Sequence, residues 1–198
     1  MITVHYDLLP EATKAYIEEQ NAGQHIYQLP DDDIDTVQIY RSFLYNGHIY
    51  SIREASENRS GNSTQRVHVD GEWTKLAHCY IFAVTVHDEK FANACVTAIV
   101  EKMAAIDWYP TGIANEVYSF TNGGDNLRKL LVDVHVYKGL GQWVRPPHDD
   151  ANGPVEFLQD VISGLAAVWS EVYEEDVMMP WEENVCAYHS HQVTFRCE

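Results

Sequence analysis

Basic residues are scarce in this chain of 198 residues, in which 13 Lys and Arg stand against 30 Asp and Glu and the formal net charge is −17. A strongly acidic surface repels the phosphates of nucleic acids and of anionic lipids. The composition therefore predicts a protein that binds neither nucleic acids nor membranes. Residues 155–184 contain eight acids and no Lys or Arg, so this segment is either a solvated face or a surface for a basic partner.

Cysteine and long apolar runs are also scarce. The cysteines are Cys79, Cys95, Cys186 and Cys197, which are too few to staple a secreted fold of this length. No stretch approaches the ~20 apolar residues that span a bilayer, and residues 1–7 lack the basic and apolar regions of a secretory signal. We therefore expect a reducing compartment, either the cytoplasm or the nucleus. Cys79 and Cys95 fall on apolar helical stripes and are predicted to be core residues.

Sequence motifs of common enzyme families are absent. The chain has no phosphate-binding G-x-x-x-x-G-K-[ST], no nucleophile elbow G-x-S-x-G and no zinc-protease H-E-x-x-H. Gly139-Leu140-Gly141 begins a dinucleotide-binding pattern, but Val144 stands in place of the third glycine. We therefore predict that the chain is not an enzyme. An enzyme or small-ligand binder, with a site of scattered His, Asp and Cys side chains, is the alternative.

Helical patterns dominate the chain after two short strand-like pieces at residues 2–5 and 25–29. Apolar side chains recur at helical spacing in several segments. These segments are residues 34–44, 76–84, 91–103, 127–137 and 158–172. Asn46-Gly47 is expected to end the first of them, because glycine readily adopts the left-handed conformation at a helix C-terminus. The pattern predicts an α+β fold with a helical majority.

Six segments match the pattern of one family in order and spacing. They are residues 4–9 (VHYDLL), 26–33 (IYQLPDDD), 43–49 (FLYNGHI), 76–99, 117–133 and 186–191. The first four resemble the VHKDLL element, the LPDDDP turn, the WLYTGRI helix end and the closing helix pair of the BTB/POZ family, and the last two resemble the helical extension of its divergent fungal members. The chain departs from the family at its start, because the strand that usually precedes the VHKDLL element, and that builds the homodimer interface in many members, has no counterpart here.

The resemblance implies a BTB/POZ-like fold with a small sheet and helix pairs in residues 1–105. Residues 106–198 would be a helical extension that ends in a tail with Cys and His residues. A polar stretch at about residues 54–72, rich in Ser, Asn and Gly, would be an insertion in the first domain.

The same resemblance implies a protein–protein interaction module rather than an enzyme. Members of the family serve as adaptors for cullin-type ubiquitin ligases or as scaffold and regulatory subunits, so the expected partners are a cullin, other proteins or a second copy of the chain. The implied partner-binding residues lie around the end of one helix. They are Tyr40, Phe43, Leu44, Tyr45, His48 and Ile49.

The tail contains the strongest chemical signal in the sequence, a C-x2-H-x-H-x5-C pattern formed by Cys186, His189, His191 and Cys197. Two thiolates and two imidazoles make a tetrahedral zinc shell. His189 and His191 would share one side of an extended strand. The predicted cofactor is a structural zinc ion, because four protein ligands leave no position for water. The alternatives are free cysteines, a Cys186–Cys197 disulfide or simple burial, and a zinc-stabilised structural or regulatory domain is thus a further candidate function.

Overall fold

The computed structural model describes residues 3–22, 33–51, 71–139, 153–168, 178–195 and 197, and within these ranges all regular structure is helical. The predicted α+β fold with a small BTB/POZ-like sheet is therefore wrong for the described residues, which include no strand. Residues 3–5 of the first predicted strand lead into the 3-10 helix η1 (Tyr6–Leu8), and His5 has an extended backbone. An extended backbone becomes a strand only when a neighbouring strand pairs with it, and residues 3–5 have no such neighbour among the described residues. The second predicted strand, residues 25–29, lies outside the described ranges.

Two helices form the N-terminal part, α1 (Glu11–Gln20) and α2 (Ile34–Asn46). The predicted end of α2 is confirmed, because Gly47 adopts the left-handed conformation with φ 72° and its N–H bonds to the carbonyl of Phe43. Residues 52–70, which contain most of the predicted polar insertion, lie outside the described ranges.

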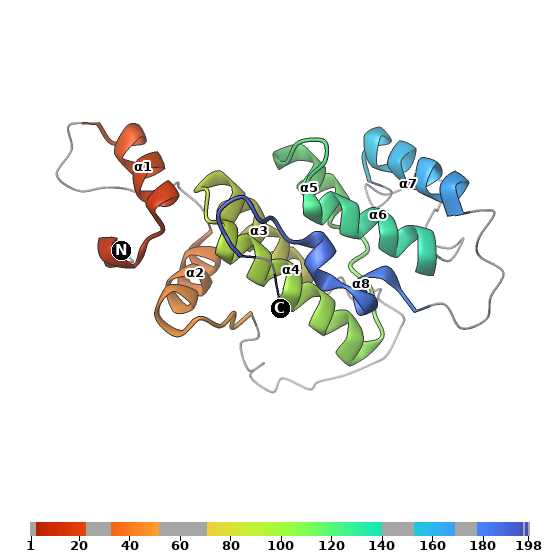
Figure 1. Ribbon diagram of the computed structural model, residues 1–198, viewed down its shortest axis with the longest axis horizontal. Coiled ribbons are helices and arrows are strands. Elements are labelled where there is room, and N and C mark those ends of the chain that lie inside the picture. The colour runs from red at the N-terminus through yellow and green to blue at the C-terminus, as the bar shows by residue number, and fades with distance from the viewer. Residues whose placement is uncertain are drawn as a thin grey trace, which may run out of the picture.

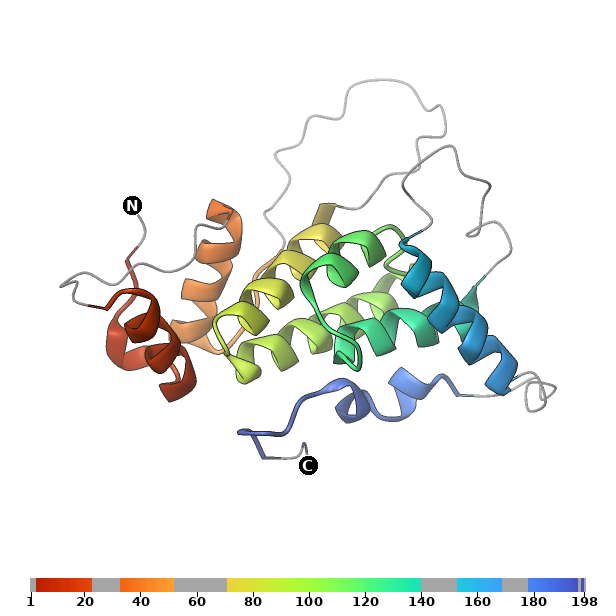
Figure 2. The ribbon, with the colours of Figure 1, turned by 90° about the horizontal axis from the view of Figure 1, so that it is seen from above.

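The centre of the molecule is the helix pair α3 (Gly71–Thr85) and α4 (Glu89–Ile106), which lie side by side in both ribbon views (Figures 1 and 2). Asp88 caps α4 by accepting a hydrogen bond from the Phe91 backbone N–H at 2.9 Å. It also accepts one from the Tyr40 hydroxyl of α2 at 2.9 Å. Cys79 and Cys95 are fully buried in this pair, which confirms their prediction as core residues.

A second group of helices packs beside this pair. It consists of α5 (Ala114–Phe120), α6 (Asn126–Lys138) and α7 (Val155–Val168). Gly164 allows α7 to approach α6 closely, because a Cβ at this position would lie 2.7 Å from a Val136 methyl carbon. The predicted domain boundary between residues 105 and 106 falls at the last residue of α4, and the buried side chains before and after it form one continuous core.

The C-terminal segment contains only the short helices α8 (Pro180–Glu183) and η4 (Val185–Tyr188). Figure 2 shows it running back along the helical body, where η4 contacts α4 and α6. Trp181 and Tyr188 are buried against the body. The Tyr188 hydroxyl donates a hydrogen bond to Asp133 at 2.7 Å, and the Lys129 ammonium lies 4.0 Å from the centroid of its ring. The C-terminal segment therefore packs against α4 and α6, in the middle of the helical bundle.

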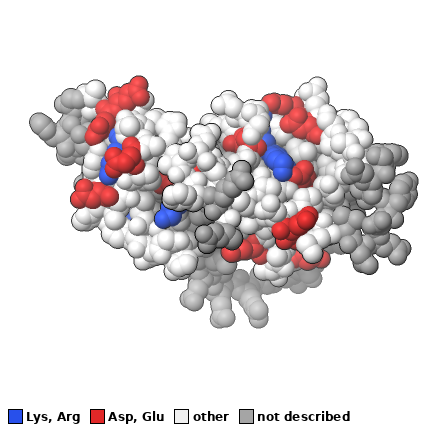
Figure 3. Space-filling model, viewed as in Figure 1, with Lys and Arg blue, Asp and Glu red and all other residues white. Residues whose placement is uncertain are grey.

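Acidic side chains outnumber basic ones on the face drawn in Figure 3. None of the described helices is both long and apolar enough to cross a membrane.

Candidate metal centre

The polar face of α4 fixes the C-terminal tail. Glu89, Asn93 and Thr97 are spaced by four residues, so their side chains lie in a row along one face of the helix. Asn93 bonds to the Ser190 backbone twice: its amide donates to the carbonyl at 2.8 Å and its oxygen accepts from the N–H at 2.8 Å. These paired bonds hold residue 190 at a fixed register on α4.

The carboxylate of Glu89 holds the turn that follows. It accepts hydrogen bonds from the backbone N–H groups of Gln192, Val193 and Thr194 at 2.9, 3.0 and 2.6 Å. The hydroxyls of Ser190 and Thr194 donate to the same carboxylate at 3.0 and 2.6 Å. Burial alone would raise the pKa of Glu89, but these hydrogen bonds outweigh it and lower the pKa to about 2.

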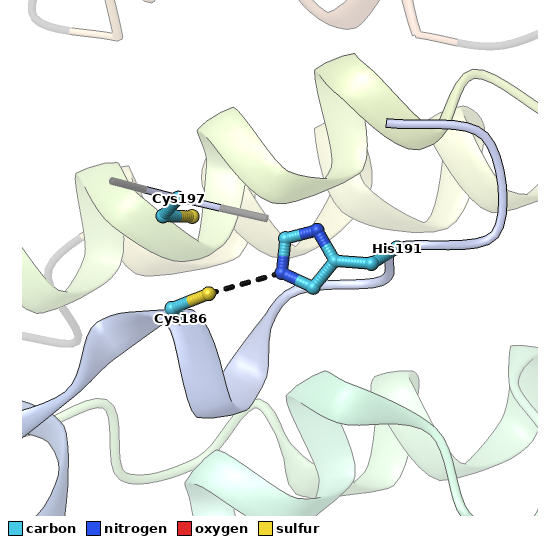
Figure 4. Close-up of side chains that lie close together, drawn as sticks. All are labelled: Cys186, His191 and Cys197. Atoms are coloured by element: carbon cyan, nitrogen blue, oxygen red, sulfur yellow. Dashed lines mark hydrogen bonds between the residues drawn. The ribbon is translucent and has the colours of Figure 1, made fainter. Parts of the chain in front are cut away.

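Three of the four predicted ligands converge in this docked tail. One ligand atom each from Cys186, His191 and Cys197 lies within 4.8 Å of the others, and within the described ranges this is the one such group of three or more His, Cys, Asp or Glu residues. Figure 4 shows the Cys186 sulfur facing the His191 ring, with 3.0 Å between Sγ and Nε2. Atoms of a tetrahedral zinc shell lie about 3.5–4 Å from each other, given Zn–S and Zn–N bonds of about 2.3 and 2.0 Å. A zinc ion therefore fits between these side chains after small shifts.

His189, the fourth predicted ligand, lies beside the group of three. Its Nδ1 is 3.0 Å from the Cys197 sulfur, and its ring centroid is 6.2 Å from that of His191. The structure thus places His189 in contact with Cys197, at the edge of the group, and His189 is not itself one of the three residues that converge.

Hydrogen bonds orient the two imidazole rings. The Thr97 hydroxyl donates to the Asn93 carbonyl at 3.1 Å, so its oxygen accepts from Nε2–H of His189 at 3.0 Å. This leaves the lone pair on Nδ1, which faces Cys197. The Thr194 hydroxyl, which donates to Glu89, lies 3.5 Å from Nδ1 of His191 and leaves Nε2 facing Cys186. Partners of this kind fix the tautomer and direction of metal-ligating histidines.

The pKa shifts favour the metal-binding forms of Cys186 and His189, whereas burial and the hydrogen bond to Cys186 raise the pKa of the Cys197 thiol. The hydrogen bond from the neighbouring Cys197 thiol, followed by contributions that include His191, lowers the pKa of Cys186. Burial lowers the pKa of His189, and the nearby His191 lowers it further. A thiolate and a neutral imidazole are the forms that bind zinc.

The residues predicted to bind a partner lie in two different environments on α2 and just after it. Tyr40 and Phe43 are buried in the core, whereas Tyr45 and His48 are exposed. Leu44 and Ile49 are half-buried. A shallow surface hollow on α2 is lined by Gln38, Arg41, Ser42, Tyr45 and Asn46. Partner binding through this region stays a prediction, and its accessible side chains are those at positions 45 and 48.

The sequence did not identify Glu89, Asn93 and Thr97 as part of the site. Their spacing marks a polar row on a helix, which is the only signal the sequence contains. The segment they bind lies about a hundred residues further along the chain, at a sequence separation of 97 for the Asn93–Ser190 bonds and 105 for the Glu89–Thr194 bonds. Only the folded structure could connect the two.

No family model, no curated protein and no solved structure matches this chain. The function of the site therefore has to follow from its own residues and their geometry.

Proposed function

We propose that this chain is a zinc-stabilised helical domain, in which one structural ion holds the C-terminal tail on the bundle. The observation that carries the proposal is the convergence of Cys186, His191 and Cys197, with His189 in contact with Cys197. Two sulfur and two imidazole ligands favour zinc over harder cations such as Mg²⁺ and Ca²⁺, which prefer oxygen.

The role of the ion is structural. Four protein ligands fill a tetrahedral shell, whereas catalytic zinc keeps one position for water or substrate. The C-terminal segment also needs such support, because its helices span only four residues each. Helices this short are not stable alone. Metal binding supplies folding free energy where a small core cannot.

Zinc binding to the full chain tests this proposal. We expect the metal-free protein to bind one equivalent of zinc with a Kd below about 100 nM, as structural sites do. Replacing His191 with Gln removes a ligand, so the tight equivalent is lost. The matched control is His48→Gln, which changes an exposed histidine just after the end of α2. Competition with a chromophoric chelator measures the affinity of each variant.

Two results would overturn the proposal. One is a wild-type chain that takes up no tight equivalent of zinc. The other is a His191→Gln variant that binds zinc as tightly as the wild type and the His48→Gln control.

A second candidate function, protein–protein interaction, is favoured by the outer face of α7. Val155, Ile162 and Leu165 lie on one side of this helix and are 71%, 65% and 41% exposed, and half-buried Leu158 lies between them. Apolar side chains in a contiguous row are more typical of an interaction surface than single exposed residues are. The row supports an interaction module of the kind expected from the sequence, with a cullin as one candidate partner.

A further inference from the structure

Glu89 is the first residue of α4 and lies beneath the metal-binding loop without belonging to its ligands. Its hydrogen-bond partners are Ser190, Gln192, Val193 and Thr194. These residues enclose His191 on both sides in the sequence. The carboxylate therefore fixes the backbone that presents the imidazole, although none of these bonds involves a candidate ligand.

Three backbone N–H groups in succession point at this one carboxylate. Hydrogen bonds to an ionised acceptor are about twice as strong as neutral ones. The donors of the turn at residues 190–194 surround the carboxylate of Glu89. The neighbouring helix η4 ends at Tyr188, before this turn begins. Without the carboxylate, the N–H groups would turn to water and the loop would sample many conformations.

Asn93 and Thr97 continue the same row toward the ligands. Asn93 also holds residue 190, and Thr97 directs the His189 ring. Glu89, Asn93 and Thr97 together therefore order the loop and the imidazole ring of His189. A loop ordered before the ion arrives binds it more tightly, because only the ordered fraction of the population is competent to bind.

We infer that Glu89 is a positioning residue for the metal centre: through Ser190 and the turn at residues 192–194 it orders the loop and thereby sets the affinity for zinc. This inference rests on the proposed function. Coupling between two binding events is reciprocal. Zinc therefore strengthens the docking of the tail on α4 by the same factor by which docking strengthens zinc binding.

The test compares Glu89→Ala with Glu101→Ala in the full chain. Glu101 belongs to the same helix and is exposed, so its removal controls for the loss of an acid from α4. We expect Glu89→Ala to weaken zinc binding by about 10- to 100-fold, the range found for residues that support metal ligands, and Glu101→Ala to leave it unchanged. Asn93→Ala is a second variant and should weaken binding in the same direction.

Cobalt(II) separates positioning from ligation. Glu89→Ala should keep the thiolate-to-cobalt absorption bands of the wild type, because all four ligands remain, and should require more cobalt to reach them. The inference is overturned if Glu89→Ala binds zinc as tightly as Glu101→Ala, or if the cobalt bands change in shape. If the wild type binds no zinc at all, the proposed function itself fails, which is a different outcome. Circular dichroism confirms that each variant keeps its helices.

Discussion

Replacing Arg128 with Leu is expected to lower the free energy of unfolding by about 3 kcal/mol, because buried hydrogen-bond acceptors lose their donor. The Arg128 side chain is only 6% exposed. Its guanidinium donates to the Thr121 hydroxyl and to the Tyr118 carbonyl, both at 2.8 Å, and also to the Thr121 carbonyl. It also pairs with Glu156 of α7 at 2.8 Å.

The large effect follows from the position of this side chain between three helices. Arg128 belongs to α6, the carbonyls lie at the end of α5, and Glu156 belongs to α7. The guanidinium carbon also lies 4.1 Å from the centroid of the Tyr118 ring. Leucine would leave the carbonyls of residues 118 and 121 buried and without this donor. Such orphaned groups cost more than the original bonds contributed.

Thermal unfolding followed by circular dichroism measures this effect. At about 3 °C per kcal/mol for a chain of this size, Arg128→Leu should lower Tm by about 10 °C. Arg41→Leu is the matched control, because Arg41 lies exposed on α2 and exposed substitutions typically change stability by less than about 0.5 kcal/mol. Equal Tm values for the two variants would contradict the role assigned to Arg128.

Replacing Tyr188 with Ala is expected to release the C-terminal segment. The side chain is fully buried, and loss of a buried aromatic ring costs about 3–5 kcal/mol. The change also removes the bond to Asp133 and the contact with the Lys129 ammonium. The segment contacts the body mainly through buried Trp181, through Tyr188 and through the row of Glu89, Asn93 and Thr97 on α4. The substitution should therefore weaken the binding of the segment to the body and leave helices α3 to α6 folded.

Hydrogen exchange resolves this local effect. Amides of residues 185–194 should lose their protection in Tyr188→Ala, while those of α3 and α4 keep theirs. Tyr188→Phe loses only the hydrogen bond to Asp133. The protection of residues 185–194 in this variant should be lower than in the wild type and higher than in Tyr188→Ala. Tyr45→Ala removes a tyrosine that is 49% exposed and serves as the control. Unchanged protection of residues 185–194 in Tyr188→Ala would show that the ring does not hold the segment.

Local sequence patterns predicted the helices well. The apolar spacing at residues 76–84 and 91–103 corresponds to α3 and α4, and that at residues 127–137 corresponds to α6. Residues 158–168 belong to α7, and the last part of that predicted segment lies outside the described ranges. These elements depend on contacts within a few residues, so their signals are contained in the local sequence.

The sheet was the main error, and its cause is physical. Four or five residues of strand-like composition say nothing about a pairing partner, whereas a sheet exists only through pairing between strands. Arg128 is a second case in which the sequence does not show which residues will become neighbours. It was not identified as a structural residue because its acceptors, at positions 118 and 121, become neighbours only after α5 and α6 pack together.

The tail was predicted in part: its ligand set was identified from the sequence, and the surface on which it docks was not. Its four Cys and His residues lie within twelve positions, so ligand type and spacing alone indicated a metal site. Their convergence is confirmed for Cys186, His191 and Cys197. The role of Glu89, Asn93 and Thr97 on α4 could not be predicted, because it depends on contacts between residues about a hundred positions apart.

X-ray absorption at the zinc edge of the zinc-loaded wild-type chain tests the central claim most directly. The account predicts one ion with two sulfur ligands at about 2.3 Å and two nitrogen ligands at about 2.0 Å, supplied by Cys186, Cys197, His189 and His191. A first shell of oxygen and nitrogen alone would contradict it, because such a shell excludes both thiolates and places the ion elsewhere on the acidic surface.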